Sequence, residues 1–330
     1  MNSEPSPAVF EVPESAAGQR LDQFLVQHVP NMTRALASAL TAAGEVRVDG
    51  RRTKKGDRLQ AGAEVRLERL PEPADFSPAP WEGSTLSVLH EDEHVVVVNK
   101  PRGLPTHPLQ RHEQETLAQA LLQRYPEMAG VGYALREPGI LHRLDTDTSG
   151  VLVAARHATA FEALRRTQRA GLWTKEYVAI CEGVPRAPDR IEAALGPDPD
   201  DPRRMRVRDA RDGEEAARVT ELVSARALGA LRTADGARVQ VSAVRVRAEK
   251  ATRHQVRVHL SYYGHPLVGD TLYGGAELLG DLTPRAHWLH ARAIAFPHPV
   301  FEGKRLSIEA PDTDEMQALE ARASEGRSGL

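Results

Sequence analysis

The sequence predicts an α+β protein with two folded domains, on three observations. The chain has 330 residues, more than one domain of ordinary size requires. A proline-rich stretch at residues 71–84 indicates a stiff linker, and beyond it alternating strand patterns occur with a few amphipathic helical ones. We therefore expect a small α/β domain at residues 16–70. At residues 85–311 we expect a larger domain with a mixed, mostly antiparallel sheet flanked by helices and loops, with residues 1–15 as a disordered tail and residues 312–330 as a C-terminal tail.

The small domain is predicted to contain two helices and a hairpin. Apolar residues recur at helical spacing over residues 20–29, and a second helix fits residues 33–43. Thr33 is the expected N-cap of this second helix, and Gly44 is expected to end it. Residues 45–50 alternate as a strand and finish on Asp-Gly, a strong signal for a tight turn.

The same segment is basic, although the whole chain carries a net charge of −3. Residues 18–70 contain ten basic and six acidic side chains. A local basic face can bind phosphate whatever the total charge, but a run of charges is more often only a solvated surface. The candidate nucleic-acid-binding residues are Arg20, Arg34, Arg47, Arg51, Arg52, Lys54 and Lys55.

Several protein classes are disfavoured by composition. Cys181 is the single cysteine, which excludes an internal disulfide framework and any cysteine-based zinc cluster. No apolar run approaches the roughly 18 residues that a membrane-spanning helix needs, and the first residues lack the layout of a secretory signal. A cytoplasmic protein without membrane attachment is expected. The sequence shows no glycine-rich phosphate loop, no dinucleotide fingerprint and no metal-ligand cluster, so no metal and no cofactor is predicted.

The larger domain contains recognisable elements along its whole length. In chain order we expect strands at 86–90 and 95–98, an irregular segment at 99–108, a helix at 116–125, a strand at 151–154, a helix at 157–170, a strand at 174–180, an exposed irregular loop at 195–216, strands at 220–223 and 239–246, and a helix at 252–260.

Residues 139–153 are the stretch with the most evident chemistry. A dense polar run there precedes a Val/Leu-rich strand, which predicts a rigid loop positioned by a sheet. Asp145 follows Arg143 closely, and a nearby positive charge favours an ionised carboxylate, so Asp145 is a candidate nucleophile. A salt-bridged structural aspartate is the alternative. Asp147 raises the further possibility of a two-carboxylate hydrolase, but no second acidic motif supports it, and Asp147 is expected to be structural.

Three motifs carry a resemblance to a known family. Residues 142–150, His-Arg-Leu-Asp-x-x-Thr-Ser-Gly, resemble the signature of the RluA-type pseudouridine synthases. The resemblance implies that Asp145 is the catalytic aspartate and that Arg143 helps to displace the target base from the RNA stack. The Lys-x-Tyr-x-Ala pattern around Tyr177 matches the active-site tyrosine, which would stack on the uracil ring. The pattern from His254 onward carries the arginine that pairs with the aspartate to Arg257.

The resemblance extends to the small domain and has departures. Residues 18–22, 33–34 and 44–50 resemble an S4 domain, a small RNA-binding module. In the larger domain, Ala251 stands where the family has glycine, and the pair at 252–253 is Thr-Arg in place of Arg-Thr. The reversal moves the arginine of this pair to Arg253, which puts its contact with a phosphate in doubt.

The expected activity is isomerisation of uridine to pseudouridine in RNA, preferably large-subunit ribosomal RNA. One ionised carboxylate can attack C1′, remove the C2′ proton or add to C6 of the base, and the sequence does not choose among these. Transfer RNA is an alternative substrate, and a non-catalytic S4-type RNA-binding or ribosome-assembly factor is an alternative function. A monomer without an obligate protein partner is expected.

Overall fold

The computed structural model describes residues 7–71, 75–208, 217–249, 251–277 and 286–325. The chain divides into two compact units, Met1–Phe76 and Ser77–Leu330, so the division falls inside the proline-rich segment. Each unit is described by itself.

The smaller unit is a four-stranded antiparallel sheet with two α-helices. Its elements are β1 (Ala8–Glu11), the 3-10 helix η1 (Glu14–Ala16), α1 (Leu21–His28), α2 (Arg34–Ala43), β2 (Val46–Val48), β3 (Arg51–Arg52) and β4 (Glu64–Leu67), and the strand order is β1-β4-β2-β3. The Thr33 hydroxyl accepts a hydrogen bond from the backbone N–H of Leu36, and Gly44 ends α2 in the left-handed region with φ of 79°. The predicted cap and helix end are confirmed.

The expectation of a disordered tail over residues 1–15 is wrong from Ala8 onward. Residues Ala8–Glu11 form β1, which pairs with β4, and Val12 is buried in the core of this unit. A four-residue edge strand gains its stability from backbone hydrogen bonds to a distant partner, which the composition of the segment does not reveal. Residues 1–6 lie outside the described part.

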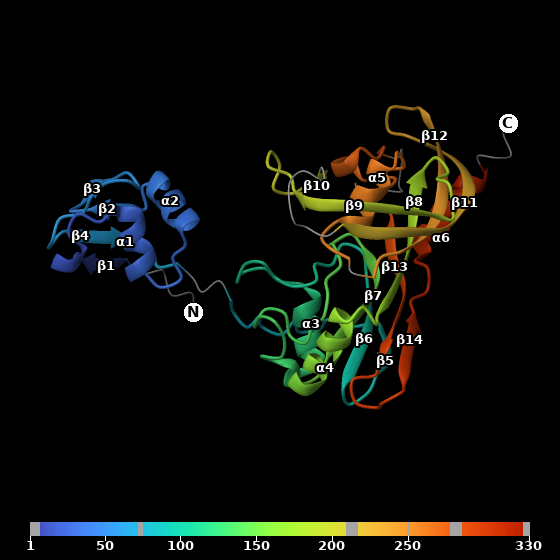
Figure 1. The fold of residues 1–330 in the computed structure, drawn as a ribbon, viewed down its shortest axis with the longest axis horizontal. Coiled ribbons are helices and arrows are strands. Elements are labelled where there is room, and N and C mark those ends of the chain that lie inside the picture. Colours follow the sequence, from blue (N-terminus) through green and yellow to red (C-terminus); the bar gives the residue numbers. More distant parts are fainter. Residues whose placement is uncertain (1–6, 72–74, 209–216, 250, 278–285, 326–330) are drawn as a thin grey trace. The chain divides into compact units, whose positions relative to one another are not determined.

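The larger unit is built on one ten-stranded sheet (Figure 1). The strands are β5 (Val88–Glu91), β6 (Val95–Lys100), β7 (Ser149–Ala155), β8 (Thr174–Glu182), β9 (Asp189–Pro197), β10 (Met205–Arg208), β11 (Arg218–Arg232), β12 (Arg238–Arg247), β13 (Leu289–Pro297) and β14 (Arg305–Glu309). Their order is β10-β9-β11-β12-β8-β13-β7-β6-β5, with β14 beside β13. Among the described residues, only the β13–β7 pair is parallel, which confirms the mixed, mostly antiparallel sheet.

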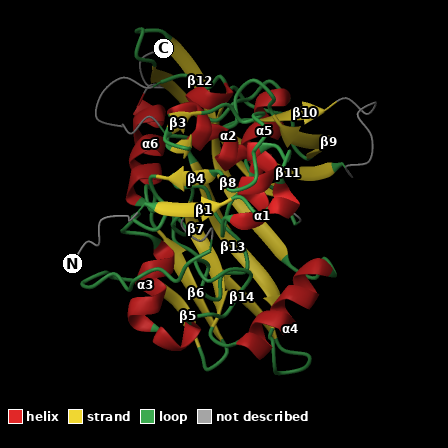
Figure 2. Cartoon of the chain, turned by 90° about the vertical axis from the view of Figure 1, so that its left-hand side faces the viewer, coloured by secondary structure: helices red, strands yellow, loops and turns green. Residues whose placement is uncertain are grey.

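Helices cover both faces of this sheet. They are α3 (Leu117–Arg124), α4 (Ala158–Arg169), α5 (Gln255–Tyr262) and α6 (Asp314–Glu325), with the 3-10 helices η2 (Pro126–Met128) and η3 (Thr271–Tyr273). Val96 and Val98 belong to the apolar cluster that includes α3 and α5, whereas Val95 and Val97 belong to the cluster that includes α4. Successive side chains of a strand point to opposite faces, so α3 and α4 lie on opposite sides of β6 (Figure 2).

Two segments of the larger unit, the expected loop at 195–216 and the expected helix end and tail at 312–330, are more regular than predicted. Within the loop expected at residues 195–216, β9 continues to Pro197 and β10 pairs with it, because Met205 packs beside Val258 and Tyr273 while the charged neighbours face outward. Residues 209–216 lie outside the described part. In the expected tail at 312–330, α6 buries Met316, Leu319 and Ala323 against β11 and β12. Their spacing of three and four residues is that of an amphipathic helix.

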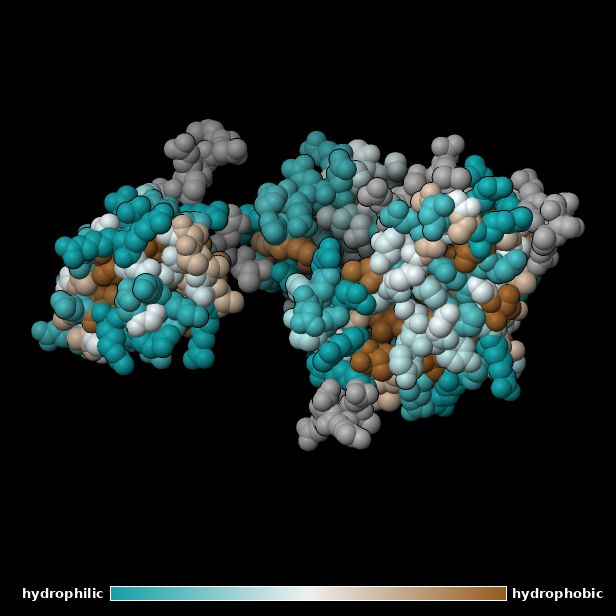
Figure 3. Space-filling view, turned by 90° about the horizontal axis from the view of Figure 1, so that it is seen from above, coloured by the Kyte–Doolittle hydropathy of each residue, from teal (hydrophilic) through white to brown (hydrophobic). Residues whose placement is uncertain are grey.

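The face of each unit seen in Figure 3 is mostly hydrophilic, with separate hydrophobic residues showing between the polar ones. Within the described residues, every helix is too short or too polar to span a bilayer. The described part of the chain also places no three His, Cys, Asp or Glu side chains so that they could hold a metal ion.

Candidate active site

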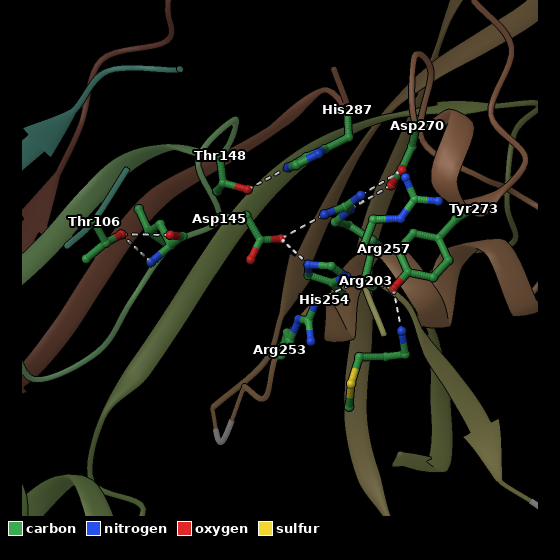
Figure 4. A network of polar contacts seen from close by, with 12 residues as sticks. Thr106, Asp145, Thr148, Arg203, Arg253, His254, Arg257, Asp270, Tyr273 and His287 are labelled. Atoms are coloured by element: carbon green, nitrogen blue, oxygen red, sulfur yellow. Dashed lines mark hydrogen bonds and ion pairs between the residues drawn. The ribbon is translucent and has the colours of Figure 1, made fainter. Parts of the chain in front are cut away.

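Asp145 lies in a tight loop that leads into β7. Thr106, from the irregular segment after β6, holds this loop in place. The Thr106 hydroxyl donates to the backbone carbonyl of Leu144 at 2.7 Å and accepts from its N–H at 3.3 Å (Figure 4). On the other side, the N–H of Thr148 donates to the Asp145 carbonyl at 3.0 Å. The backbone before and after Asp145 is therefore fixed, which positions its carboxylate on a rigid support.

Lys100, at the end of β6, also holds the Asp145 loop in place. Its side chain is fully buried, and its Nζ donates to the carbonyls of Pro101, Leu104 and Thr146 at 3.0, 2.7 and 2.9 Å. Burial lowers the pKa of Lys100 to about 7, with the charges of Asp147 and Asp145 acting in the opposite direction. Three carbonyl acceptors match the three hydrogens of an ammonium, so the geometry corresponds to the charged form. This lysine joins the irregular segment after β6 to the Asp145 loop.

Arg257, on α5, connects two carboxylates. Its Nη1 lies 3.0 Å from Oδ2 of Asp145, while Nε and Nη2 contact the two oxygens of Asp270 at 2.7 and 2.8 Å. The Asp270 pair is bidentate and buried, which fixes the plane of the guanidinium. Asp145 then meets a cation whose orientation is already set by a second residue.

The charge state of Asp145 follows from this arrangement. Burial alone would raise the pKa of its carboxyl, but positive charge from His254, Arg257 and His287 holds that pKa below its usual value. Burial in turn lowers the pKa of His254 to about 4 and that of His287 to about 3. Both imidazoles are therefore neutral near pH 7, and Arg257 is the cation that keeps Asp145 ionised there.

His254 lies between the Tyr273 hydroxyl, to which it is hydrogen-bonded, and the Asp145 carboxylate. The Tyr273 hydroxyl accepts from the N–H of Met205 at 2.8 Å and lies 2.7 Å from Nδ1 of His254. The phenol and Nδ1 share one hydrogen in this contact, and the other ring nitrogen, Nε2, faces Asp145. Nε2 lies 3.7 Å from Oδ2 of Asp145. In the described part of the chain, Oδ1 of Asp145 takes no hydrogen bond, so it is the oxygen left for substrate.

Asp145 opens into a cavity of about 600 Å³, enough for a nucleotide. Tyr177 lines the cavity from β8, and burial together with the charge of Asp145 raises the pKa of its phenol, which stays protonated. The charged side chains of the lining, among the described residues, are Asp145, Glu249, Arg143, Arg169, Lys175, Arg218, Arg253 and Arg257. Cations therefore outnumber carboxylates by six to two in this lining, which favours an anionic ligand.

The structure brings together the three residues predicted to form the site. Asp145, Tyr177 and Arg257 come from three separate segments and line one cavity, together with Arg143. Arg253 has a structural role: its guanidinium donates to the carbonyls of Pro202 and Arg203 and anchors the turn between β9 and β10 (Figure 4). At the start of α5, the N-cap residue His254 has a left-handed backbone conformation, with φ of 55°.

Asp147, considered for a two-carboxylate site, does not line the described cavity. The candidate residues of the smaller unit divide into two groups. Arg34, Arg51, Arg52, Lys54 and Lys55 are exposed. Arg20 instead pairs with Asp22 through two hydrogen bonds of 3.0 and 2.8 Å, and Arg47 lies 3.8 Å from Glu68.

Sequence reasoning missed most of the supporting residues. Lys100, Lys175, His254, Asp270, Tyr273 and His287 were not predicted to serve the site. Lys100, Lys175 and His254 stand in segments that resemble the family's motifs, and Lys175 lies two positions before Tyr177 on the same face of β8, but none of them was assigned a role. Asp270 follows a Gly in an apparent turn, and only the fold brings it to Arg257.

An ionised carboxylate, a fixed guanidinium and an aromatic ring in a cationic cavity fit an enzyme that acts on a nucleic acid. A family model described as RNA pseudouridylate synthase matches residues 94–262, and an S4 domain model matches residues 19–65. The chain belongs to the RluA-type RNA pseudouridine synthase family. It is accordingly an isomerase with an RNA substrate and carries an S4 domain.

Curated relatives and solved structures agree with this assignment. "Ribosomal large subunit pseudouridine synthase D" of Xanthomonas campestris is 34% identical over 319 residues, which cover 93% of this chain and 90% of that protein. The protein of the same name from Pseudomonas aeruginosa is 34% identical, with 91% of each chain covered. The structure titled "Human RNA Pseudouridylate Synthase Domain Containing 1" matches with a TM-score of 0.53 and 26% identity, over 71% of this chain and 86% of that one.

Proposed function

We propose that this enzyme isomerises a uridine in large-subunit ribosomal RNA and that Asp145 is its catalytic carboxylate. The contact of Asp145 with Arg257 carries the proposal for the residue, because it leaves an ionised oxygen facing a nucleotide-sized cavity. The names of the two bacterial relatives support the ribosomal substrate. Such a substrate implies action in the cytoplasm, and we propose that the enzyme works there as a monomer.

The reaction breaks the bond from C1′ to N1, turns the uracil and joins C1′ to C5. C5 then releases its proton to solvent, and N1 takes up a proton. Asp145 supplies an electron pair to the bound nucleoside, and Arg257 keeps that pair unprotonated. Tyr177 offers its ring to a uracil held outside the RNA stack, and its neutral phenol can donate a hydrogen bond. Unstacking the target costs a few kcal/mol, which stacking on Tyr177 and insertion of Arg143 offset.

The proposal is tested by release of tritium from RNA labelled at C5 of uridine. Wild-type enzyme should release tritium from large-subunit ribosomal RNA, and Asp145→Asn should reduce the rate by roughly 10³-fold or more while RNA binding is kept. Asp147→Asn is the matched control, because it changes a carboxylate of the same loop outside the cavity lining. Release from transfer RNA alone would contradict the ribosomal substrate. RNA binding without release would favour an assembly factor.

A further inference from the structure

The inference concerns Lys175, a buried lysine beside the proposed uracil site, and it rests on the proposed function of that site. Lys175 is 6% exposed, and it lines the same cavity as Asp145 and Tyr177. Across the described ranges of the chain, its ammonium makes no hydrogen bond and no ion pair, and the centroid of the Trp173 ring lies 5.9 Å from Nζ.

This isolation distinguishes Lys175 from the other buried cations near the site. Lys100 satisfies its three hydrogens with carbonyls, and Arg257 is neutralised by two carboxylates. Taking a charge out of water without a partner costs several kcal/mol, so such groups are normally paired. Burial accordingly lowers the pKa of Lys175 to about 8. A buried ammonium that faces a cavity and has no hydrogen-bond or ionic partner among the described residues can take such a partner from the ligand.

The position of Lys175 indicates which part of a nucleotide it meets. Lys175 and Tyr177 are two residues apart on β8 and point to the same face, which separates them by about 6.8 Å along the strand. A uracil stacked on Tyr177 necessarily brings its own ribose and phosphate into the cavity, since all three are covalently joined. The phosphate lies beyond the ribose, at a distance from the uracil ring comparable to the separation of Lys175 and Tyr177. It is also the part of the nucleotide that carries a negative charge.

We propose that Lys175 is a phosphate-binding residue of the active site, whose ammonium contacts a phosphodiester oxygen flanking the flipped uridine. Arg169, exposed at the end of α4 and part of the same lining, extends this subsite to the cavity mouth. A contact with the neutral edge of the base would leave the lysine charge uncompensated. The phosphate therefore satisfies the electrostatics better than the uracil does.

The test measures tritium release from a short RNA that the wild type modifies, with single neutral methylphosphonates placed at the linkages flanking the target. For the wild type, one such replacement should raise KM about tenfold with little effect on kcat. Lys175→Met should raise KM on the native RNA by a similar factor and should be indifferent to that methylphosphonate. For this variant, the slope of the logarithm of the binding constant against the logarithm of the salt concentration should also be smaller in magnitude by about 0.7. Lys175→Arg should recover part of the affinity, because it restores the positive charge.

Other outcomes would overturn the proposal. A fall in kcat for Lys175→Met with unchanged KM and a changed pH profile would make Lys175 a proton-transfer group. Equal losses on native and methylphosphonate RNA, with a lower unfolding temperature, would make its role structural. Arg165→Met is the matched control: Arg165 also lies on the α4 side but pairs with Glu162, and its replacement should leave KM unchanged. Absence of tritium release by the wild type would instead contradict the proposed function, and so the two failures are distinguishable.

Discussion

Arg257 and Asp145 are 112 positions apart in the chain, yet their side chains meet at 3.0 Å. The contact joins α5 to the loop before β7, and its geometry depends on Asp270, which holds the other edge of the same guanidinium. Electrostatic stabilisation of this kind is effective because the groups are oriented before the substrate arrives.

Asp270→Asn should lower kcat by roughly 10²-fold with little change in KM, because Arg257 loses its bidentate anchor and the site loses its alignment. The free energy of unfolding should also fall, by about 3 kcal/mol, since a buried guanidinium is left partly unpaired. Steady-state kinetics and chemical denaturation measure both effects. An unchanged kcat would show that Asp145 needs no fixed partner.

The pH at which Asp145 titrates should depend on Arg257. The pKa of the Asp145 carboxyl is lowered in the folded protein, so its ionisation stabilises the fold above the unfolded-state value of 3.8, and this contribution is lost as the pH falls through the folded pKa. Arg257→Gln removes the permanent positive charge and leaves burial, which raises the pKa. Carbon-13 NMR of labelled aspartate should therefore show the Asp145 titration moving to higher pH in this variant, and a shift to lower pH would contradict the electrostatic account.

Tyr177→Ala should weaken binding of the substrate RNA by roughly 5- to 150-fold, because stacking of one base contributes about 1–3 kcal/mol. Tyr177→Phe keeps the ring and should bind normally, so any loss of kcat in this variant measures the hydroxyl. Fluorescence anisotropy with labelled RNA gives the affinities. Equal affinities for the Ala and Phe variants would remove Tyr177 from the stacking role.

Lys100→Met should lower the free energy of unfolding by on the order of 3 kcal/mol, because three carbonyl groups lose their buried donor. Urea denaturation followed by circular dichroism measures the change. Lys55→Met, at an exposed lysine of the smaller unit, is the control and should change stability by less than about 0.5 kcal/mol. A stable Lys100 variant would mean that the loop is held by Thr106 alone.

Replacement of Arg51, Arg52, Lys54 and Lys55 with alanine should weaken RNA binding and reduce its salt dependence, while kcat at saturating RNA stays near the wild-type value. These side chains are exposed in the S4 domain, whereas the proposed chemistry takes place in the larger unit. Binding measured at several salt concentrations tests the prediction. A loss of kcat would assign these residues a part in the reaction.

The sequence could predict the residues that act on substrate better than the residues that hold them in place. Asp145, Tyr177 and Arg257 stand in long local motifs, whereas the segments that contain Lys100 and Asp270 were read as a cleft wall and a scaffold turn, with no role for either side chain. Their roles arise from contacts made only after folding. Helices with clear periodicity, such as α4, were predicted well, whereas β1 and β10 are short strands that depend on partners elsewhere in the chain.

The strand order has a consequence for synthesis of the protein. β13, formed by Leu289–Pro297, lies between β7 and β8, so those two strands do not pair with each other. While the ribosome is still making the chain, both strands present open edges until this late segment emerges from the exit tunnel. Strands with open edges can pair with other chains, so the nascent protein needs protection until Leu289–Pro297 has emerged.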